Sequence, residues 1–285
     1  MSQVLVHKER EIMEKYTLIK KLGEGGTSGV YLGADRVTGK RVAIKKYSRG
    51  GDLSWVENER CLLESLDHPA IPKVKEVVCQ GGYFYLVMEY VPGKTMKEWI
   101  TSRGRIAEEQ VSRWGFELCG VLSCLHGSGN RILFRDLKPG NIMISPTGQI
   151  RLIDFGAALR MSVGANGTPQ VTPKEPLGTP GYAAPEQFVR QGQLTPAADI
   201  YALGAVLYHG LSGYRPDPSS KRIPLRKLNR HISRGMEYIV MKCLENELDR
   251  RYQTVEQIKR DLEDTASCYK KNKKKLYLLR SELQV

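Results

Sequence analysis

The spacing of apolar residues changes near residue 92, which predicts two regions of different structure. Before Pro92, short runs rich in β-branched and aromatic residues alternate with turn residues, as is typical of strands. The expected strands are Tyr16–Ile19 leading into a glycine-rich hairpin up to Leu32, then Arg41–Tyr47, Lys73–Cys79 and Tyr83–Glu89. Beyond Gly93 apolar residues recur every three or four positions, which favours helices.

One helix is predicted inside the strand-rich region. Ser54 and Glu57 have the spacing of a capping box, and His68-Pro69 would end the helix. The residues expected to share its apolar face are Trp55, Glu59, Leu62, Leu63 and Leu66.

The second region is predicted to be mainly helical. One long helix would carry Val111, Trp114, Leu118, Val121, Leu122 and Leu125 on one face and end at Gly127. The run 200–211 is apolar nearly all round, as in a buried helix, and 237–244 and 254–264 favour closing helices. Segment 160–180 has the composition of a mobile loop.

Two polar motifs carry the most specific chemistry. Residues 134–141 read Phe-Arg-Asp-Leu-Lys-Pro-Gly-Asn, and 154–156 read Asp-Phe-Gly. Together they supply two carboxylates (Asp136 and Asp154), an amide (Asn141) and a lysine (Lys138). This set suits the binding of a metal-bound triphosphate and the deprotonation of a hydroxyl group. Asn and Asp favour a hard cation, because soft metals prefer Cys or His.

A buried ion pair is the second candidate feature. Residues 42–45 alternate, so Ala43 and Lys45 share one face of a strand. An inward-pointing lysine needs an anion, and Glu59 lies on the apolar face of its helix, where an unpaired carboxylate is costly. The alternative is that Glu59 turns to solvent and Lys45 is an edge-strand charge.

These motifs, the glycine-rich segment 23–30 and Ala184-Pro185-Glu186 together resemble the eukaryotic-like (Hanks-type) protein serine/threonine kinases, bacterial members above all. The resemblance covers residues 16 to about 263 and implies an α+β, bilobal protein kinase fold. It implies a kinase domain at 16–265, with an N-lobe at 16–88, a hinge at 89–93 and a C-lobe at 94–265. Residues 1–15 would be an N-terminal arm and 266–285 a basic tail.

The resemblance also implies roles for the polar residues. Asp136 would accept the proton of the substrate hydroxyl, and Lys138 would neutralise charge on the γ-phosphate. Lys45 would hold the α- and β-phosphates and Glu59 would orient it, while Thr179 matches the threonine that contacts the catalytic Asp in Ser/Thr kinases.

The implied cofactors are ATP and Mg²⁺, with Mn²⁺ as an alternative ion. Asn141 and Asp154 would bind the metal. Adenine would lie between the lobes, and the residues expected to contact the nucleotide are Gly23, Gly25, Ser28, Val30, Ala43, Lys45, Met88, Glu89, Val91, Met143 and Asp154. Two residues of the large lobe, Glu186 and Arg251, match the partners of a buried ion pair, and Asp199 matches a residue that caps the catalytic loop.

The chain departs from the family pattern at three places. Ser28 occupies the third glycine position of the nucleotide loop. Phe134 replaces the usual His. We expect it to pack in an apolar stack with Val74, Leu63 and Phe155 and to take no direct part in the reaction. Only fourteen positions separate Lys45 from Glu59, which predicts a helix shorter at its start.

Regulation is predicted to involve Arg135, which in the family often pairs with a phosphorylated residue of the activation loop. Thr172 is the first candidate for autophosphorylation, followed by Thr168 and then Ser162. The alternative is that these are polar loop residues without a regulatory role.

Charge and cysteine content refine the expected surroundings. The net charge is +13, and within 267–285 six basic residues face one acidic residue. That tail would bind an anionic membrane surface, as in a membrane-anchored kinase, or be a solvated helix end or a nucleic-acid contact. The six cysteines show no metal-ligand spacing and predict reduced core thiols in a cytoplasmic protein. No signal peptide is expected at the start.

The primary prediction is therefore an active protein Ser/Thr kinase that uses Mg-ATP, acts on protein substrates, and self-associates for autophosphorylation in trans. The alternative is a pseudokinase or scaffold, favoured only by Ser28 and Phe134. A small-molecule kinase is disfavoured by the complete 179–186 segment. A nucleic-acid partner is not expected, since no aromatic-basic motif is present.

Overall fold

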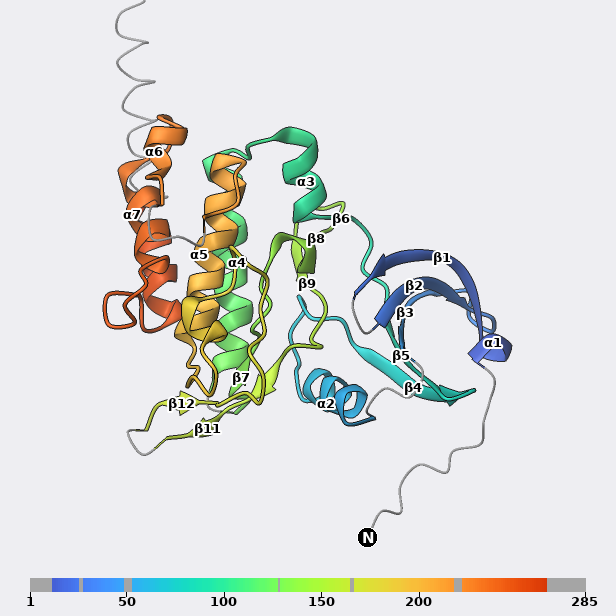
Figure 1. Ribbon diagram of the computed structural model, residues 1–285. Helices are drawn as coiled ribbons and strands as arrows, with labels where there is room; N and C mark the ends of the chain where they lie inside the picture. The colour runs from blue at the N-terminus through green and yellow to red at the C-terminus, as the bar shows by residue number, and fades with distance from the viewer. Residues whose placement is uncertain are drawn as a thin grey trace, which may run out of the picture. The chain divides into compact units, whose positions relative to one another are not determined.

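The computed structural model describes residues 12–25, 28–48, 53–127, 129–164, 167–217 and 222–265. These residues form two compact units (Figure 1). The first contains the described residues up to Pro92 together with Ile153–Gly156, and the second contains Gly93–Leu152 and the described residues from Ala157 onward. The basic tail 266–285 and the arm up to residue 11 lie outside the described residues.

The first unit is built on an antiparallel sheet with the strand order β1-β2-β3-β5-β4. Its elements are α1 (Ile12–Lys15), β1 (Tyr16–Glu24), β2 (Ser28–Asp35), β3 (Arg41–Tyr47), α2 (Leu53–Glu64), β4 (Val74–Gln80) and β5 (Tyr83–Glu89). Helix α2 packs against β4 and β5 (Figure 1). All the strands expected from the sequence are present.

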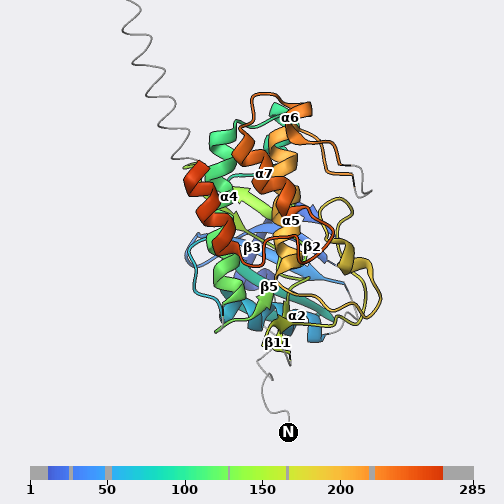
Figure 2. The same cartoon turned by 90° about the vertical axis from the view of Figure 1, so that its left-hand side faces the viewer.

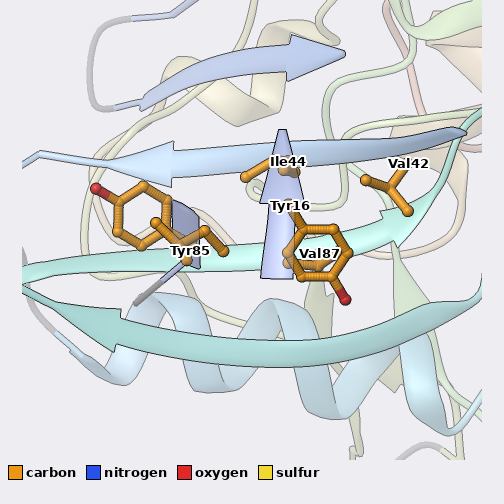
Figure 3. Packing of buried hydrophobic residues seen from close by; sticks show 6 residues of the cluster. Tyr16, Val42, Ile44, Tyr85 and Val87 are labelled. Carbon is orange, nitrogen blue, oxygen red and sulfur yellow. The ribbon is translucent and has the colours of Figure 1, made fainter. Parts of the chain in front are cut away.

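One face of this sheet is closed by an apolar cluster that α1 completes. Val42 and Ile44 of β3 meet Tyr85 and Val87 of β5, with Tyr16 beside them (Figure 3), and Ile12 belongs to the same cluster. Because side chains alternate along a strand, the other face of β3 presents Ala43, Lys45 and Tyr47. Burial of Val42 and Ile44 therefore fixes the direction in which Lys45 points.

Helix α2 corrects two details of the sequence prediction. It begins at Leu53, so Ser54 is its second residue and not its N-cap. Trp55 is 57% exposed, whereas Val56 is buried. The face that packs on the sheet runs through Val56, Glu59 and the two leucines at 62 and 63. Glu59 keeps its predicted inward position, because it lies three residues from Val56 on the same side.

The second unit contains most of the helices. Its elements are β6 (Lys94–Thr95), α3 (Met96–Arg103), α4 (Glu108–His126), β7 (Ile132–Leu133), η1 (Pro139–Asn141), β8 (Ile142–Ile144), β9 (Ile150–Leu152), β10 (Leu159–Arg160), β11 (Ser162–Val163), β12 (Pro169–Gln170), η2 (Pro185–Phe188), α5 (Ala197–Ser212), α6 (Leu225–Leu228) and α7 (Arg234–Cys243). Residues 255–265 are also helical. Helix α5 packs against both α4 and α7 (Figure 2).

The predicted helices of this unit are confirmed. All six apolar residues expected on one face of α4 are buried, and Gly127 caps its end. Helix α5 is buried along almost its whole length. It approaches α7 so closely at Gly204 that a Cβ atom there would lie 2.4 Å from the Cβ of Cys243. A glycine is therefore required where these two helices cross.

The overall prediction of an α+β fold, with a small strand-rich region and a larger helical one, agrees with these elements. The loop predicted at 160–180 contains the short hairpin β11–β12. Two cysteines depart from the expected core positions, since Cys61 and Cys79 are exposed. Among the described residues, no helix has both the length and the apolar character needed to cross a membrane.

Candidate active site

The first unit holds a buried cluster of charges around Lys45. Its Nζ atom donates to both carboxylate oxygens of Glu59, at 2.9 and 2.7 Å, and to Oδ1 of Asp154 at 2.7 Å. Lys45 and Glu59 are almost completely buried, whereas the Asp154 side chain is 47% exposed. The predicted Lys45–Glu59 pair is present, so the alternative of a solvent-facing Glu59 is wrong.

The carboxylates keep this lysine charged. Burial acts to lower the pKa of Lys45, but the negative charges of Glu59 and Asp154 outweigh it, so the pKa lies above its usual value. Gly156 leaves room for the cluster, because a Cβ atom there would lie 2.9 Å from Nζ of Lys45. The cluster therefore offers one fixed positive charge beside a partly exposed carboxylate.

Tyr47 is a member of this cluster that the sequence reading missed. Its hydroxyl group donates to Oε2 of Glu59 at 2.6 Å, and burial followed by the charge of Glu59 raises the pKa of Tyr47 strongly. The alternation that turns Lys45 inward applies equally to Tyr47, two residues further along β3. The alternation along this strand could therefore have predicted the inward position of Tyr47 from the sequence.

The other residues predicted to contact the nucleotide in the first unit lie on or beside four strands, β1, β2, β3 and β5. Gly23 pairs with Val30 across the β1–β2 hairpin, and the N–H of Gly25 donates to the carbonyl of Ser28 at 2.8 Å. The tip residues 26 and 27 lie outside the described residues. Ala43 of β3 lies opposite Met88 of β5.

The segment around the end of β5 supplies the other two predicted contacts in this unit. The N–H of Glu89 donates to the carbonyl of Lys73 at 2.9 Å, so this N–H is already engaged. Val91 is buried. In the second unit, Met143 lies on β8, opposite Arg151 of β9.

The second unit holds a separate polar cluster around Asp136. Its Oδ1 atom accepts a hydrogen bond from the Thr179 hydroxyl at 2.8 Å. Its Oδ2 atom accepts from Nζ of Lys138 at 2.6 Å and from Nδ2 of Asn141 at 3.1 Å. Nζ of Lys138 also donates to Oγ1 of Thr179 at 3.2 Å. The structure thus brings together four residues that the sequence predicts to act together, from two loops forty residues apart.

Asn141 carries an amide oxygen, a donor of the kind that a hard divalent cation prefers. Nδ2 of Asn141 donates to the backbone carbonyl of Asp136 at 2.9 Å, so the amide oxygen takes no part in this hydrogen bond. The described residues contain no cluster of three or more Asp, Glu, His or Cys side chains suited to a metal. A metal shared between one or two protein oxygens and phosphate groups is the arrangement that Mg²⁺ favours.

Asp199 fixes the backbone that carries Asp136. Its fully buried carboxylate accepts from the N–H groups of Phe134 and Arg135, both at 2.8 Å, and contacts Nε2 of His126 at 2.8 Å. Arg135 has a φ of 69°, a conformation that L-residues rarely adopt. The predicted capping role of Asp199 is confirmed, whereas His126, at the end of α4, was not found from the sequence.

Phe134 is completely buried, its backbone N–H donates to Asp199, and its carbonyl accepts from the N–H of Asp136 at 2.9 Å. The stack predicted for Phe134 with Phe155, Leu63 and Val74 draws on both units, and it stays a prediction. Phe155 and Leu63 are themselves buried in the first unit.

Arg135 is a buried cation that forms no ion pair with a carboxylate among the described residues. Within the described part of the chain, its guanidinium donates to the carbonyl oxygens of Ala157 and Glu175, both at 3.4 Å, and its buried Nε atom has no partner there. Burial lowers the pKa of Arg135 in spite of the charges of Asp199 and Asp136. A buried charge with such long contacts is costly unless an anion joins it.

The two threonines predicted as phosphorylation sites differ in their surroundings. Thr172 is exposed and lies three residues from Glu175, whose carbonyl faces Arg135. Thr168 lies in the β11–β12 hairpin, where its carbonyl accepts from Gly164 at 3.0 Å.

The segment that follows is held firmly to the second unit. Nη1 of Arg251 lies 2.7 Å from Oε1 of Glu186 and also donates to the carbonyl of Ala197 at 2.7 Å, so the predicted ion pair is present. Gln187 is a further contact that the sequence did not indicate. Its amide donates to the carbonyls of Arg135 and Leu177, at 2.8 and 3.0 Å.

A comparison with protein-family models decides the assignment. The model described as "Protein kinase domain" matches residues 16–276, which is most of the chain. The chain belongs to the protein kinase domain family. The fold and the order of the motifs described above agree with this membership, and nothing in the comparisons favours a pseudokinase.

Several similar proteins carry serine/threonine kinase names. The chain is 30% identical to the serine/threonine-protein kinase PrkC of Bacillus subtilis, over 96% of this chain and 44% of that protein. It is 32% identical to a probable serine/threonine-protein kinase of Clostridium perfringens, over 87% of this chain and 38% of that protein. It is 30% identical to the serine/threonine-protein kinase PknB of Mycobacterium tuberculosis, over 88% of this chain and 43% of that protein. The expected similarity to bacterial members is confirmed.

These relatives support the assignment of an ATP-dependent serine/threonine protein kinase domain. The chain spans less than half the length of each of these three proteins. The comparisons therefore characterise the domain, and they do not describe what the remainder of each relative does.

Proposed function

We propose that this chain transfers the γ-phosphoryl group of ATP to serine and threonine hydroxyls of protein substrates, within a domain at 16–265. The observation that carries the proposal is the Asp136 cluster, in which one carboxylate is held by Lys138, Asn141 and Thr179 at hydrogen-bond distances. A general base must be fixed in this way to receive a proton from a hydroxyl group.

In the proposed reaction, the substrate hydroxyl loses its proton to Asp136 while its oxygen forms a bond to the γ-phosphorus. The bond between the γ-phosphorus and the bridging oxygen breaks, and ADP leaves with the electron pair. Lys138 lies 2.6 Å from Asp136 and can also balance charge that develops on the γ-phosphate. Thr179 holds the other carboxylate oxygen and so limits the orientations of the base.

Lys45 is proposed to bind the α- and β-phosphates. Its two bonds to Glu59 keep the ammonium group in one place, and its charge persists across the physiological pH range because its pKa is raised. The nucleotide contacts predicted at Gly23, Gly25, Ser28, Val30, Ala43, Met88, Glu89, Val91 and Met143 stay proposals of the same kind.

Asn141 and Asp154 are the proposed ligands of Mg²⁺, with Mn²⁺ as the alternative ion. Both present oxygen donors, which hard cations prefer. When bound, the metal would neutralise phosphate charge. Both side chains are held in place by neighbouring groups. The amide of Asn141 donates to the carbonyl of Asp136, and the carboxylate of Asp154 accepts from Lys45.

Phosphorylation of Thr172 is the proposed means of regulation. No carboxylate of the described residues pairs with Arg135, and Thr172 is exposed on the segment whose Glu175 carbonyl faces Arg135. A phosphate group would supply charge-assisted hydrogen bonds to the guanidinium. Phosphopeptide mapping of active protein tests this, and an unmodified Thr172 in fully active protein would reject it.

Autophosphorylation in trans would require two copies of the chain to meet, and a dependence of its rate on protein concentration would reveal this.

The basic tail is proposed to bind anionic lipid at the cytoplasmic surface, although residues 266–285 lie outside the described ones. Sedimentation with anionic vesicles, with and without residues 267–285, tests that proposal; equal binding would reject it.

The activity is tested with labelled ATP, Mg²⁺ and a mixed peptide substrate. We expect label transfer by the wild type and none by Asp154→Asn, while both bind nucleotide. A wild type that binds ATP but transfers no phosphate would favour the pseudokinase alternative. Equal transfer by the variant would exclude Asp154 from the reaction.

A further inference from the structure

Arg215 is an exposed cation that lies against the turn carrying Thr179. A Cβ atom at Gly181 would lie 2.9 Å from both Cγ and Cδ of Arg215, so the aliphatic part of the arginine packs directly on this glycine. Gly181 has a φ of 85°, which favours glycine in any case. Among the described residues, no carboxylate forms an ion pair with Arg215.

Two of the groups that Arg215 influences, Tyr182 and His209, form a neutral pair. The hydroxyl of Tyr182 lies 2.6 Å from Nδ1 of His209, in the last turn of α5. Burial, and then the charge of Arg215, lowers the pKa of His209 to about 4, so the ring is neutral near pH 7. Burial raises the pKa of Tyr182 to about 12, so its hydroxyl is also neutral. Neither Tyr182 nor His209 therefore supplies a charge that would neutralise the guanidinium.

Arg215 packs beside Gly181, which lies close in the chain to the threonine that contacts Asp136. Thr179 donates to Asp136 at 2.8 Å, and Gly181 follows Thr179 by two residues. The N–H of Tyr182 returns to the carbonyl of Thr179 at 3.0 Å, so the chain turns tightly here. Two residues span at most about 7 Å, and a peptide chain covers a similar distance in two or three residues.

We propose that Arg215 selects substrates with an aspartate or glutamate within about three residues of the acceptor. An arginine can bind a carboxylate through two parallel N–H groups, which gives direction as well as attraction. The proposal rests on the proposed function, because it requires the acceptor hydroxyl to lie at Asp136. The substrate class is therefore an acidic Ser/Thr peptide, and not the basic peptide that a carboxylate at the same position would favour.

The test uses two peptides that are identical except that the aspartates flanking the acceptor are replaced by asparagines. The wild type should show a kcat/KM about three- to tenfold higher for the acidic peptide, the range expected for one partly exposed charge pair. Arg215→Ala should abolish this preference and Arg215→Glu should reverse it. Arg215→Lys should retain part of it.

Arg230→Ala is the matched control, because Arg230 is an exposed arginine of the same unit. It should leave the preference unchanged. Equal kcat/KM values for the two peptides in the wild type, or a preference that survives in Arg215→Ala, would overturn the assignment. A phosphorylated residue in place of the aspartate extends the comparison: much stronger use of that peptide would reassign Arg215 to phosphate recognition.

Failure of the proposed function can be distinguished from failure of this inference. If no peptide is phosphorylated, the proposed function fails, but fluorescence anisotropy still measures peptide binding. Tighter binding of the acidic peptide that weakens at high salt and disappears in Arg215→Ala would support the proposed recognition of acidic residues by Arg215. Equal binding of the two peptides would overturn it.

Discussion

Replacing Tyr47 by phenylalanine removes one hydroxyl group from the buried cluster around Glu59 and leaves the aromatic ring in place. The hydroxyl donates to Oε2 of Glu59 at 2.6 Å, and both side chains are largely buried. A hydrogen bond to a charged group contributes about 1.5–3 kcal/mol to stability. Because Oε2 also accepts from Lys45 at 2.7 Å, the carboxylate keeps a partner in the variant. We therefore expect a loss of about 1.5–2 kcal/mol, in the lower half of that range.

Denaturant unfolding with an intrinsic fluorescence probe measures this loss as a lower transition midpoint at unchanged m-value. Tyr85→Phe is the matched control, since Tyr85 is buried in the neighbouring strand and its hydroxyl makes no hydrogen bond with a described residue. The control should change stability by less than about 0.5 kcal/mol. Equal effects of the two substitutions would refute the claim that Tyr47 stabilises Glu59. Phosphotransfer should fall less than tenfold in Tyr47→Phe, because both bonds from Lys45 to Glu59 remain.

Three further predictions follow from other contacts. Gly204→Ala should lower stability by at least about 2 kcal/mol, because its Cβ would lie 2.4 Å from that of Cys243; calorimetry that shows no decrease would contradict the close packing. Arg251→Met should cost about 3–5 kcal/mol by leaving Glu186 unpaired, and unchanged denaturation midpoints would refute it. His209 has a folded-state pKa of about 4, below its unfolded value, so its contribution to stability should be lost as the pH falls from about 6.5 to 4. His209→Asn should flatten this part of the pH profile, and an identical profile would contradict the assignment.

The sequence predicted the elements whose patterns are local. Alternation along β3 placed Lys45 on the inner face, and the apolar face of α4 was read correctly from its period. The start of α2 was misplaced because Ser54 mimics a capping residue, and Trp55 was assigned to the core because either Trp55 or Val56 can precede Glu59 on a helical face.

The polar contacts that depend on long-range packing were harder to predict. His126 meets Asp199 across 73 residues, and Gln187 meets the carbonyl of Arg135 across 52. Each side chain lies far in the sequence from its partner, so no local pattern indicates the contact. The position of Arg215 could not be predicted from the sequence either, because its proximity to Gly181 depends on how the loop after α5 folds back.

The central claim is that the Asp136 cluster transfers phosphate to serine and threonine. The most direct measurement is phosphoamino-acid analysis of a mixed Ser/Thr/Tyr peptide after reaction with labelled Mg-ATP, by the wild type and by Asp136→Asn. We predict phosphoserine and phosphothreonine with the wild type, and a loss of at least about a hundredfold in Asp136→Asn while nucleotide binding is retained. Phosphate transfer by Asp136→Asn at the wild-type rate, or no transfer by a wild type that binds ATP, would contradict the account.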